Sequence, residues 1–184
     1  LDRQIHKLED ENEAFDTRNT LQNEKKQASD RLRLQMEAVL KVIETTINQH
    51  MSEISDYVSQ GKDNPPVLGI KEYNSYSFET PKDTGTGTNF KGMLIYDISI
   101  LKSTALPALV HDSLLFANVS DDTIGQILAL YAREKQKQIF IAFDRASKYD
   151  KMAQSIIREN TVLKLDADEQ ALFGRKWGRK DAAK

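Results

Sequence analysis

The sequence predicts an α/β protein that carries a long N-terminal helical arm, and three observations support this prediction. The first glycine is Gly61 and the first proline is Pro65, so the first sixty residues contain no helix breaker and are rich in Glu, Lys, Gln, Arg and Asp. Beyond residue 65, short apolar runs alternate with amphipathic segments. The order strand–helix–strand–helix–strand after residue 106 is typical of a mostly parallel sheet flanked by helices.

The arm, residues 1–60, shows apolar residues at three- and four-residue spacing. Its stronger seam begins after a polar stretch and comprises Leu32, Met36, Val39, Leu40, Ile43, Ile47, Met51 and Ile54. A helix of this kind cannot bury its seam alone and needs a partner helix. We therefore predict a coiled coil, paired either with an antiparallel helix of a longer parent chain or with a second copy in a homodimer.

The break at Gly61–Pro66 ends the arm, and a lobe is expected from residue 65 to residue 174. Two runs rich in β-formers flank the turn residues Asn74-Ser75, which predicts a hairpin of Val67–Tyr73 and Tyr76–Thr80. A small-residue loop, Thr84–Thr88, comes next. Apolar residues at helical spacing then predict a helix over Asn89–Leu101.

The second half of the lobe supplies the alternating pattern of the predicted sheet. Short apolar runs predict strands and amphipathic stretches predict helices, and Ser120 or Asp121 is available as an N-cap. The expected elements are strand Leu106–His111, helix Ser120–Lys135, strand Gln138–Phe143, helix Ala146–Glu159 and strand Thr161–Leu165. Residues 175–184 form a basic tail with one tryptophan, which we expect to be disordered.

Composition excludes several classes of protein. The net charge of −2 gives no global electrostatic reason to expect nucleic acid or a membrane as partner. The absence of cysteine excludes disulfides and thiolate metal sites and suits a reducing cytoplasm. No apolar run is long enough to span a bilayer, and the charged start is not a signal peptide. We expect a cytoplasmic piece of a longer protein, with no membrane partner.

The loop Thr84–Thr88 is a candidate phosphate-binding element. Its glycines allow close backbone approach, and N–H groups at a helix start attract anions, to which threonine hydroxyls add donors. A loop of glycine and threonine is, however, common without a ligand. Phe90 stands where the dinucleotide fingerprint needs a third glycine, and G-x-x-x-x-G-K-[ST] occurs nowhere in the chain.

Asp112 is a candidate metal ligand because it ends the apolar strand that follows this loop and its helix. The end of a central parallel strand is where Mg²⁺ and its phosphate are commonly held. A simple turn cap is the alternative role of Asp112. The acidic pair Asp121 and Asp122 then opens the next helix, and the following strand ends at Asp144.

These motifs together resemble a bacterial YydD-type family of SMC-like ATPases. The resemblance covers residues 65–174 and is carried by Lys82–Gly87 with Lys91-Gly92, by Leu109–Phe116 and by Ser120–Asp122. It implies that the chain is the C-terminal half of an ABC/SMC-like ATPase head with the end of its coiled-coil arm. The N-terminal lobe that carries the Walker A phosphate loop would then be its partner, and ATP with Mg²⁺ would be bound only by the complete head.

The resemblance also implies residue roles. The signature loop, which donates to the γ-phosphate held by an opposing head, would be Thr84, Gly85, Thr86, Gly87 and Thr88. Asp112 would be the Walker B carboxylate that acts through Mg²⁺. An alternative register makes His111 the metal-side residue and Asp112 the catalytic base. Asp121 or Asp122 would lie in the D-loop at the dimer interface.

Departures from the ATPase pattern leave the enzymatic activity open. Ser113 stands where a glutamate usually follows the Walker B aspartate, and a hydroxyl cannot replace that general base. Phe143 and Asp144 stand where a switch histidine is usual. We expect ATP hydrolysis only with the missing N-terminal lobe.

Three functions are compatible with the sequence. The first is an ATPase half-head in DNA-linked bacterial defence or maintenance, with DNA as a further partner. The second is a coiled-coil dimerisation or interaction protein whose α/β lobe binds no nucleotide. The third is a nuclease that binds Mg²⁺ through Asp112 and Asp144, although no D-x₁₀₋₂₀-E-x-K spacing supports it.

The chain by itself is predicted neither to bind ATP tightly nor to hydrolyse it. The physical reason is the missing phosphate loop, whose backbone amides and lysine hold the phosphates in this class of ATPase. Calorimetric titration with ATP should show no binding at micromolar concentrations, and a micromolar dissociation constant would contradict the prediction.

Overall fold

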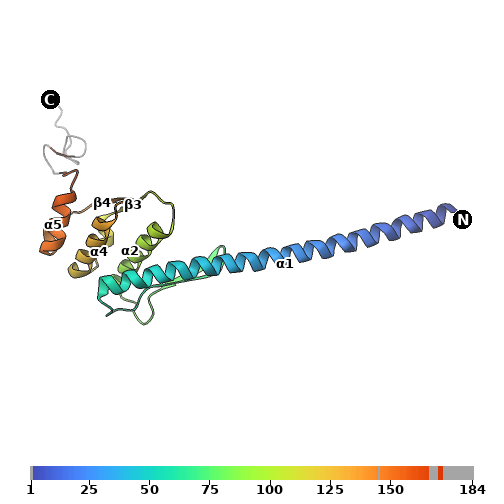
Figure 1. The fold of residues 1–184 in the computed structure, drawn as a ribbon, viewed down its shortest axis with the longest axis horizontal. Coiled ribbons are helices and arrows are strands. Elements are labelled where there is room, and N and C mark those ends of the chain that lie inside the picture. The colour runs from blue at the N-terminus through green and yellow to red at the C-terminus, as the bar shows by residue number, and fades with distance from the viewer. Residues whose placement is uncertain (1, 145, 166–169, 172–184) are drawn as a thin grey trace, which may run out of the picture.

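The protein consists of a long helix and a small α/β lobe at its C-terminal end (Figure 1). The computed structural model describes residues 2–144, 146–165 and 170–171. The elements, in chain order, are α1 (Asp2–Ser59), β1 (Val67–Glu72), β2 (Ser75–Glu79), α2 (Thr86–Ser103), β3 (Ala108–His111), α3 (Ser113–Phe116), α4 (Asp121–Arg133), β4 (Gln138–Ile141), the 3₁₀ turn η1 (Ala146–Lys148) and α5 (Lys151–Asn160).

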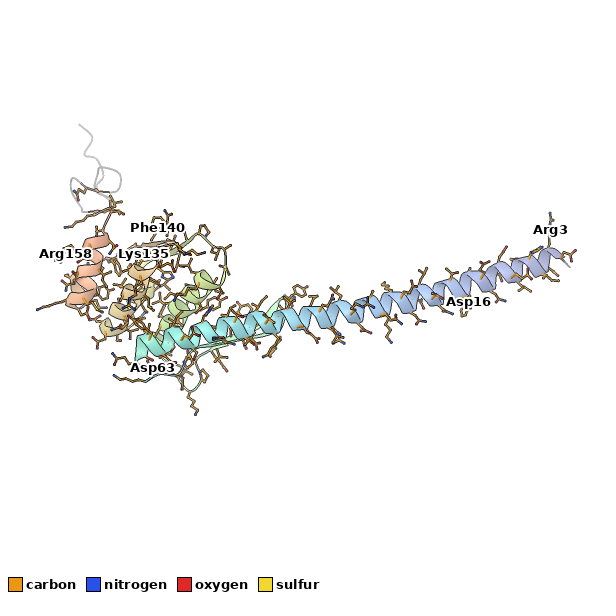
Figure 2. All side chains as sticks on the ribbon, viewed as in Figure 1. Arg3, Asp16, Asp63, Lys135, Phe140 and Arg158 are labelled. Atoms are coloured by element: carbon orange, nitrogen blue, oxygen red, sulfur yellow. The ribbon has the colours of Figure 1, made fainter. Side chains whose placement is uncertain are left out.

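The arm is the single helix α1 of 58 residues, which corresponds to a length of about 87 Å. Most of it projects away from the lobe, with its side chains in solvent (Figure 2). The helix ends where Gln60 and Gly61 adopt positive φ angles of 56° and 71°. The Gly61 N–H donates to the Asp56 carbonyl, which caps the last turn.

The last turns of α1 belong to the core of the lobe. Met51 is fully buried, and Ile47, Ile54 and Val58 are each less than a tenth exposed. They pack with α2 and α4, whose own core residues include Leu94, Ile95, Ile98, Ile124 and Ile127. The arm is therefore held by hydrophobic burial and is not merely linked to the lobe by a loop.

The hairpin β1–β2 is fastened to the side of the arm. The two strands are antiparallel, with Leu68 opposite Phe78. The side-chain amide of Asn48 accepts from the Leu68 N–H and donates to the Leu68 carbonyl, both at 2.8 Å. The Glu44 carboxylate accepts from the Ile70 N–H at 2.8 Å. Side chains of α1 thus satisfy the edge of β1 that would otherwise be open to solvent.

The strands β3 and β4 form a two-stranded parallel sheet in which Val110 lies opposite Phe140. The inner face, formed by Leu109, His111, Ile139 and Ile141, is partly or fully buried under the helices. On the outer face, Val110 is 73% exposed and Phe140 is 51% exposed. Parallel sheets are normally covered on both faces, and no element among the described residues covers this outer face.

The predicted α/β class, the long N-terminal helix, the hairpin and the parallel pair of strands are confirmed. The predicted strand Thr161–Leu165 is wrong, because these residues form no strand and all of them are exposed, Val162 by 96%. A strand forms only where a neighbour supplies backbone hydrogen bonds. The predicted helix Ala146–Glu159 is divided into η1 and α5, and the short helix α3 was not predicted.

Two expectations concern other parts of the chain. The basic tail, residues 175–184, lies outside the described residues. Within the described part of the chain, no helix combines the length and apolarity that crossing a bilayer requires.

The burial of Met51 predicts that the arm stabilises the lobe. Met51→Ala should lower the free energy of unfolding by about 2–5 kcal/mol, because it leaves a cavity between α1 and α2. The control is Val42→Ala on the same helix, where the side chain is 66% exposed, and its effect should stay within about 0.5 kcal/mol. Chemical denaturation measures both, and equal effects would show that the arm is not part of the core.

Candidate functional site

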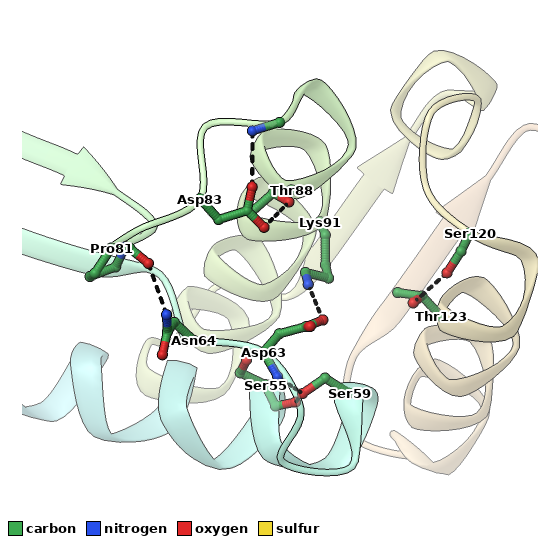
Figure 3. Close-up of polar contacts among 11 residues, drawn as sticks. Ser55, Ser59, Asp63, Asn64, Pro81, Asp83, Thr88, Lys91, Ser120 and Thr123 are labelled. Carbon is green, nitrogen blue, oxygen red and sulfur yellow. Dashed lines mark hydrogen bonds and ion pairs between the residues drawn. The ribbon is translucent and has the colours of Figure 1, made fainter.

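The predicted loop Thr84–Thr88, called the glycine–threonine loop below, is a loop only at Thr84 and Gly85, because α2 begins at Thr86 rather than at the predicted Asn89. Asp83 organises this segment. The Asp83 carboxylate accepts from the Gly85 N–H at 3.0 Å and from the Thr88 hydroxyl at 2.7 Å (Figure 3). The hydrogen bond from Thr88, followed by that from Gly85, holds the pKa of Asp83 below its usual value. Asp83 is exposed, so this carboxylate lies on the surface beside any anion that would approach the loop.

The loop lies directly beside the segment that opens α4. A Cβ atom on Gly87 would stand 2.5 Å from the Asn118 carbonyl oxygen, so only glycine fits there without displacement of the backbone. Two residues further, Ser120 precedes α4 and donates to the Thr123 hydroxyl at 2.8 Å. The structure therefore brings two sequence-predicted elements together, the loop and the acidic first turn with Asp121 and Asp122.

Asp112 follows β3 and is the N-cap of α3. Its carboxylate accepts from the Ser113 N–H at 2.7 Å and, at 3.4 Å, from the Ser113 hydroxyl. The side chain is exposed at the C-terminal end of the parallel sheet. It therefore has a local capping role, and it also offers a solvent-accessible oxygen ligand at the strand end that the sequence predicted.

His111, the residue before Asp112, points into the interior and is only 3% exposed. Its Nε2 lies 3.0 Å from Asp97 Oδ2 on α2, and its Nδ1 lies 2.9 Å from the Tyr131 hydroxyl on α4. Burial, and then the charge of Asp97, raise the pKa of Tyr131, so the phenol stays protonated. Both ring nitrogens of His111 are thus engaged with protein groups.

Sequence reasoning missed three polar contacts around these elements. Asp97 interrupts the apolar run of α2 and is bonded to His111, a signal that the sequence did contain. The buried Lys91 donates to Asp63 Oδ2 at 2.5 Å, and Asn64 Nδ2 donates to the Pro81 carbonyl at 3.0 Å (Figure 3). These last two contacts tie the segment after the arm to both sides of the glycine–threonine loop.

A metal ion would need ligands that the described residues do not gather. In residues 2–144, 146–165 and 170–171 there is no group of three or more His, Cys, Asp or Glu side chains able to hold a metal. Asp144 is exposed beyond the end of β4, and it belongs to no such group among the described residues. The described residues thus add no observation in favour of the nuclease alternative, which stays a hypothesis.

The contact at Gly87 predicts a glycine-specific position. Gly87→Ala should lower the free energy of unfolding by about 1–3 kcal/mol, because the new methyl group would displace the Asn118 carbonyl. The matched control is Gly92→Ala on the same helix, where a Cβ meets its nearest atom at 3.5 Å and the better helix propensity should leave stability unchanged or raised by up to about 1 kcal/mol. Thermal and chemical unfolding compare the two, and equal stabilities would contradict the close approach.

The fold is similar to solved heads of SMC proteins. One is described as "Structural biochemistry of ATP-driven dimerization and DNA stimulated activation of SMC ATPases", with a TM-score of 0.54 and 14% identity over 73% of this chain and 84% of that chain. Another is an Smc head bound to the C-winged helix domain of ScpA, with a TM-score of 0.51 and 16% identity over 65% of this chain. The match spans 39% of that second chain. The TM-scores show a similar fold, and at such low identities they show the fold alone, which confirms the predicted head-like architecture.

Comparison with curated proteins found no match. Residues 43–177 match a family described as uncharacterised protein conserved in bacteria (DUF2326), and the match includes the end of the arm and every candidate site residue. The YydD-type name stays a prediction. Because the matched segment spans well over half of the sequence, the chain belongs to the bacterial family DUF2326.

Proposed function

We propose that this chain is the C-terminal half of an SMC-like ATPase head, which binds ATP and Mg²⁺ only together with an N-terminal lobe that carries a Walker A loop. The observation that carries the proposal is the uncovered sheet. Val110 and Phe140 expose the apolar outer face of β3–β4, and a parallel sheet needs a second layer there. The exposed segment 161–165, with apolar side chains at Val162, Leu163 and Leu165, has no strand partner among the described residues and would gain one from an added sheet.

Asp112 is the residue we propose on the metal side. Its carboxylate is exposed at the C-terminal end of a parallel strand, and oxygen ligands are those that Mg²⁺ prefers. The burial of His111 and the hydrogen bonds at both its ring nitrogens favour this register over the one in which His111 is the ligand. Mg²⁺ would supply charge neutralisation to the ATP phosphates, with the rest of its shell from water and the nucleotide.

The loop Thr84–Thr88 is proposed to receive the γ-phosphate of ATP held by an opposing head. The first-turn N–H groups of α2 have no partner within the helix, and the hydroxyls of Thr84 and Thr86 are exposed. Asp121 and Asp122 would lie in the D-loop, beside this loop through the Gly87–Asn118 contact. Ser113 after Asp112 supplies no general base, so hydrolysis would depend on groups outside this chain.

The arm is proposed to transmit engagement of the heads. Its last turns are buried against α2, and the Lys91–Asp63 and Asn64–Pro81 contacts link the segment behind it to the loop. Further out, apolar side chains of the seam are exposed, including Leu32, Val39 and Ile43, which favours a partner helix, antiparallel or from a second copy. Action on DNA, in defence or maintenance, is proposed from the likeness to SMC heads.

The alternative proposal is a coiled-coil interaction protein whose lobe binds no nucleotide. Two observations favour it: Asp112 caps α3, and Asp83 occupies donors at the start of α2 with a negative charge. Both carboxylates would then be purely structural. The two proposals differ in what Asp112 does when a complete head is present.

Asp112→Asn should lower the rate of ATP hydrolysis by the full-length parent protein at least tenfold, because it removes a charge from the Mg²⁺ shell at the strand end. The control is Asp56→Asn, on the exposed side of α1, which should hydrolyse ATP like the parent. Asn can still cap α3, so the fold is retained. Equal turnover by the parent and Asp112→Asn, or a parent that neither binds nor hydrolyses ATP, would favour the interaction protein.

A further inference from the structure

The pair of hydrogen bonds at His111 joins the three elements that carry the candidate nucleotide residues. Asp97 lies on α2, which begins at the glycine–threonine loop. Tyr131 lies on α4, which begins with the acidic pair of the proposed D-loop. His111 itself ends β3 and is followed at once by Asp112. One buried imidazole thus connects all three.

The direction of the hydrogen bonds follows from the donors available. The Asp97 carboxylate only accepts, so the hydrogen lies on His111 Nε2. In the tautomer that carries its hydrogen on Nε2, Nδ1 is an acceptor and takes the hydrogen bond of the Tyr131 hydroxyl at 2.9 Å. Both ring nitrogens of His111 are therefore paired, which selects one tautomer and one orientation of the ring.

Packing alone gives no reason for a histidine at this position. The other inward-facing residues of the sheet are Leu109, Ile139 and Ile141, all apolar. A polar side chain in that row costs free energy unless each of its groups is paired. Apolar contacts tolerate small displacements, whereas hydrogen bonds are directional and lose strength within a few tenths of an ångström. Among these inward-facing residues, the polar one is His111, and it lies at the strand end next to Asp112.

We propose that His111 is a positioning residue, held by Tyr131 and Asp97, which sets the place of the Asp112 carboxylate relative to the loop at α2 and the start of α4. The proposal rests on the proposed ATPase function, since it assigns His111 to the same site. It predicts that loss of either hydrogen bond affects turnover while nucleotide binding is retained. It also accounts for the side chain without a role for His111 as metal ligand.

The test uses the full-length parent protein with Tyr131→Phe and Asp97→Asn. Each should lower kcat for ATP by about 3- to 10-fold, the range for one hydrogen bond, with KM for ATP unchanged within about twofold. The double variant should lose little more than the worse single variant, because both act through the same ring. The matched control is Tyr96→Phe on α2, whose ring packs on Phe78 and whose hydroxyl is outside the chain of hydrogen bonds; it should behave like the parent.

A second readout is independent of turnover. Nitrogen-15 NMR of the His111 ring should show the hydrogen on Nε2, and Tyr131→Phe should shift the Nδ1 signal while Tyr96→Phe leaves it in place. The Nδ1–H tautomer in the unmodified protein would overturn the proposal. Asp97, whose side chain is 34% exposed, gives the milder variant if Tyr131→Phe unfolds.

The outcomes separate this proposal from the one on which it rests. If Asp112→Asn slows hydrolysis but Tyr131→Phe and Asp97→Asn have the kcat of the parent, the positioning role is wrong and the ATPase stands. If Asp112→Asn itself has the parent's turnover, both proposals fall together. If Tyr131→Phe or Asp97→Asn raises KM for ATP by as large a factor as it lowers kcat, the positioning role is also wrong, because the variant then binds ATP poorly.

Discussion

The burial of the last turns of α1 against α2 is the interaction on which the rest of the lobe depends. Met51, Leu94 and Ile95 are fully buried in it, and these contacts join an element of 58 residues to one of 18. With α1 held in this way, the hairpin has a neighbour for its open edge, and α2 has a fixed direction from which its N-terminal loop reaches the start of α4. The arm thus acts as a structural layer of a lobe that has too few strands to build a core alone.

Hydrogen bonds and an ion pair fix the relative positions of elements that hydrophobic burial brings together. Asn48 and Glu44 on α1 bind the backbone of β1. The Lys91–Asp63 and Asn64–Pro81 contacts join the glycine–threonine loop to the segment after the arm. Tyr131 and Asp97 bind His111 at the end of β3. Each of these contacts lies at a boundary between elements, where a directional bond decides register more sharply than apolar packing does. The candidate site residues are therefore carried on elements whose relative positions are constrained.

The same lobe is incomplete on its outer side. Among the described residues, the two-stranded parallel sheet exposes Phe140, and segment 161–165 after α5 has no strand partner. This form is expected when further layers are supplied by another part of a protein. This incompleteness is compatible with the proposed function, in which nucleotide binding would be a property of an assembled head. The capping roles of Asp83 and Asp112 are compatible with that interpretation, since capping leaves both carboxylates exposed.

The sequence by itself determined the elements whose signals are local. The absence of breakers before Gly61 predicted α1, helical spacing predicted α2 and α4, and apolar runs predicted β3 and β4, because each pattern reflects the geometry of its own element. Tertiary structure decided what depends on neighbours. It left residues 161–165 unpaired, since a strand needs a partner, and it turned His111 inward onto Asp97 and Tyr131, which are fourteen and twenty residues away in sequence. It also placed Gly87 against Asn118, which requires glycine at position 87. The sequence pattern could not predict this requirement, because it arises only where two separate segments meet.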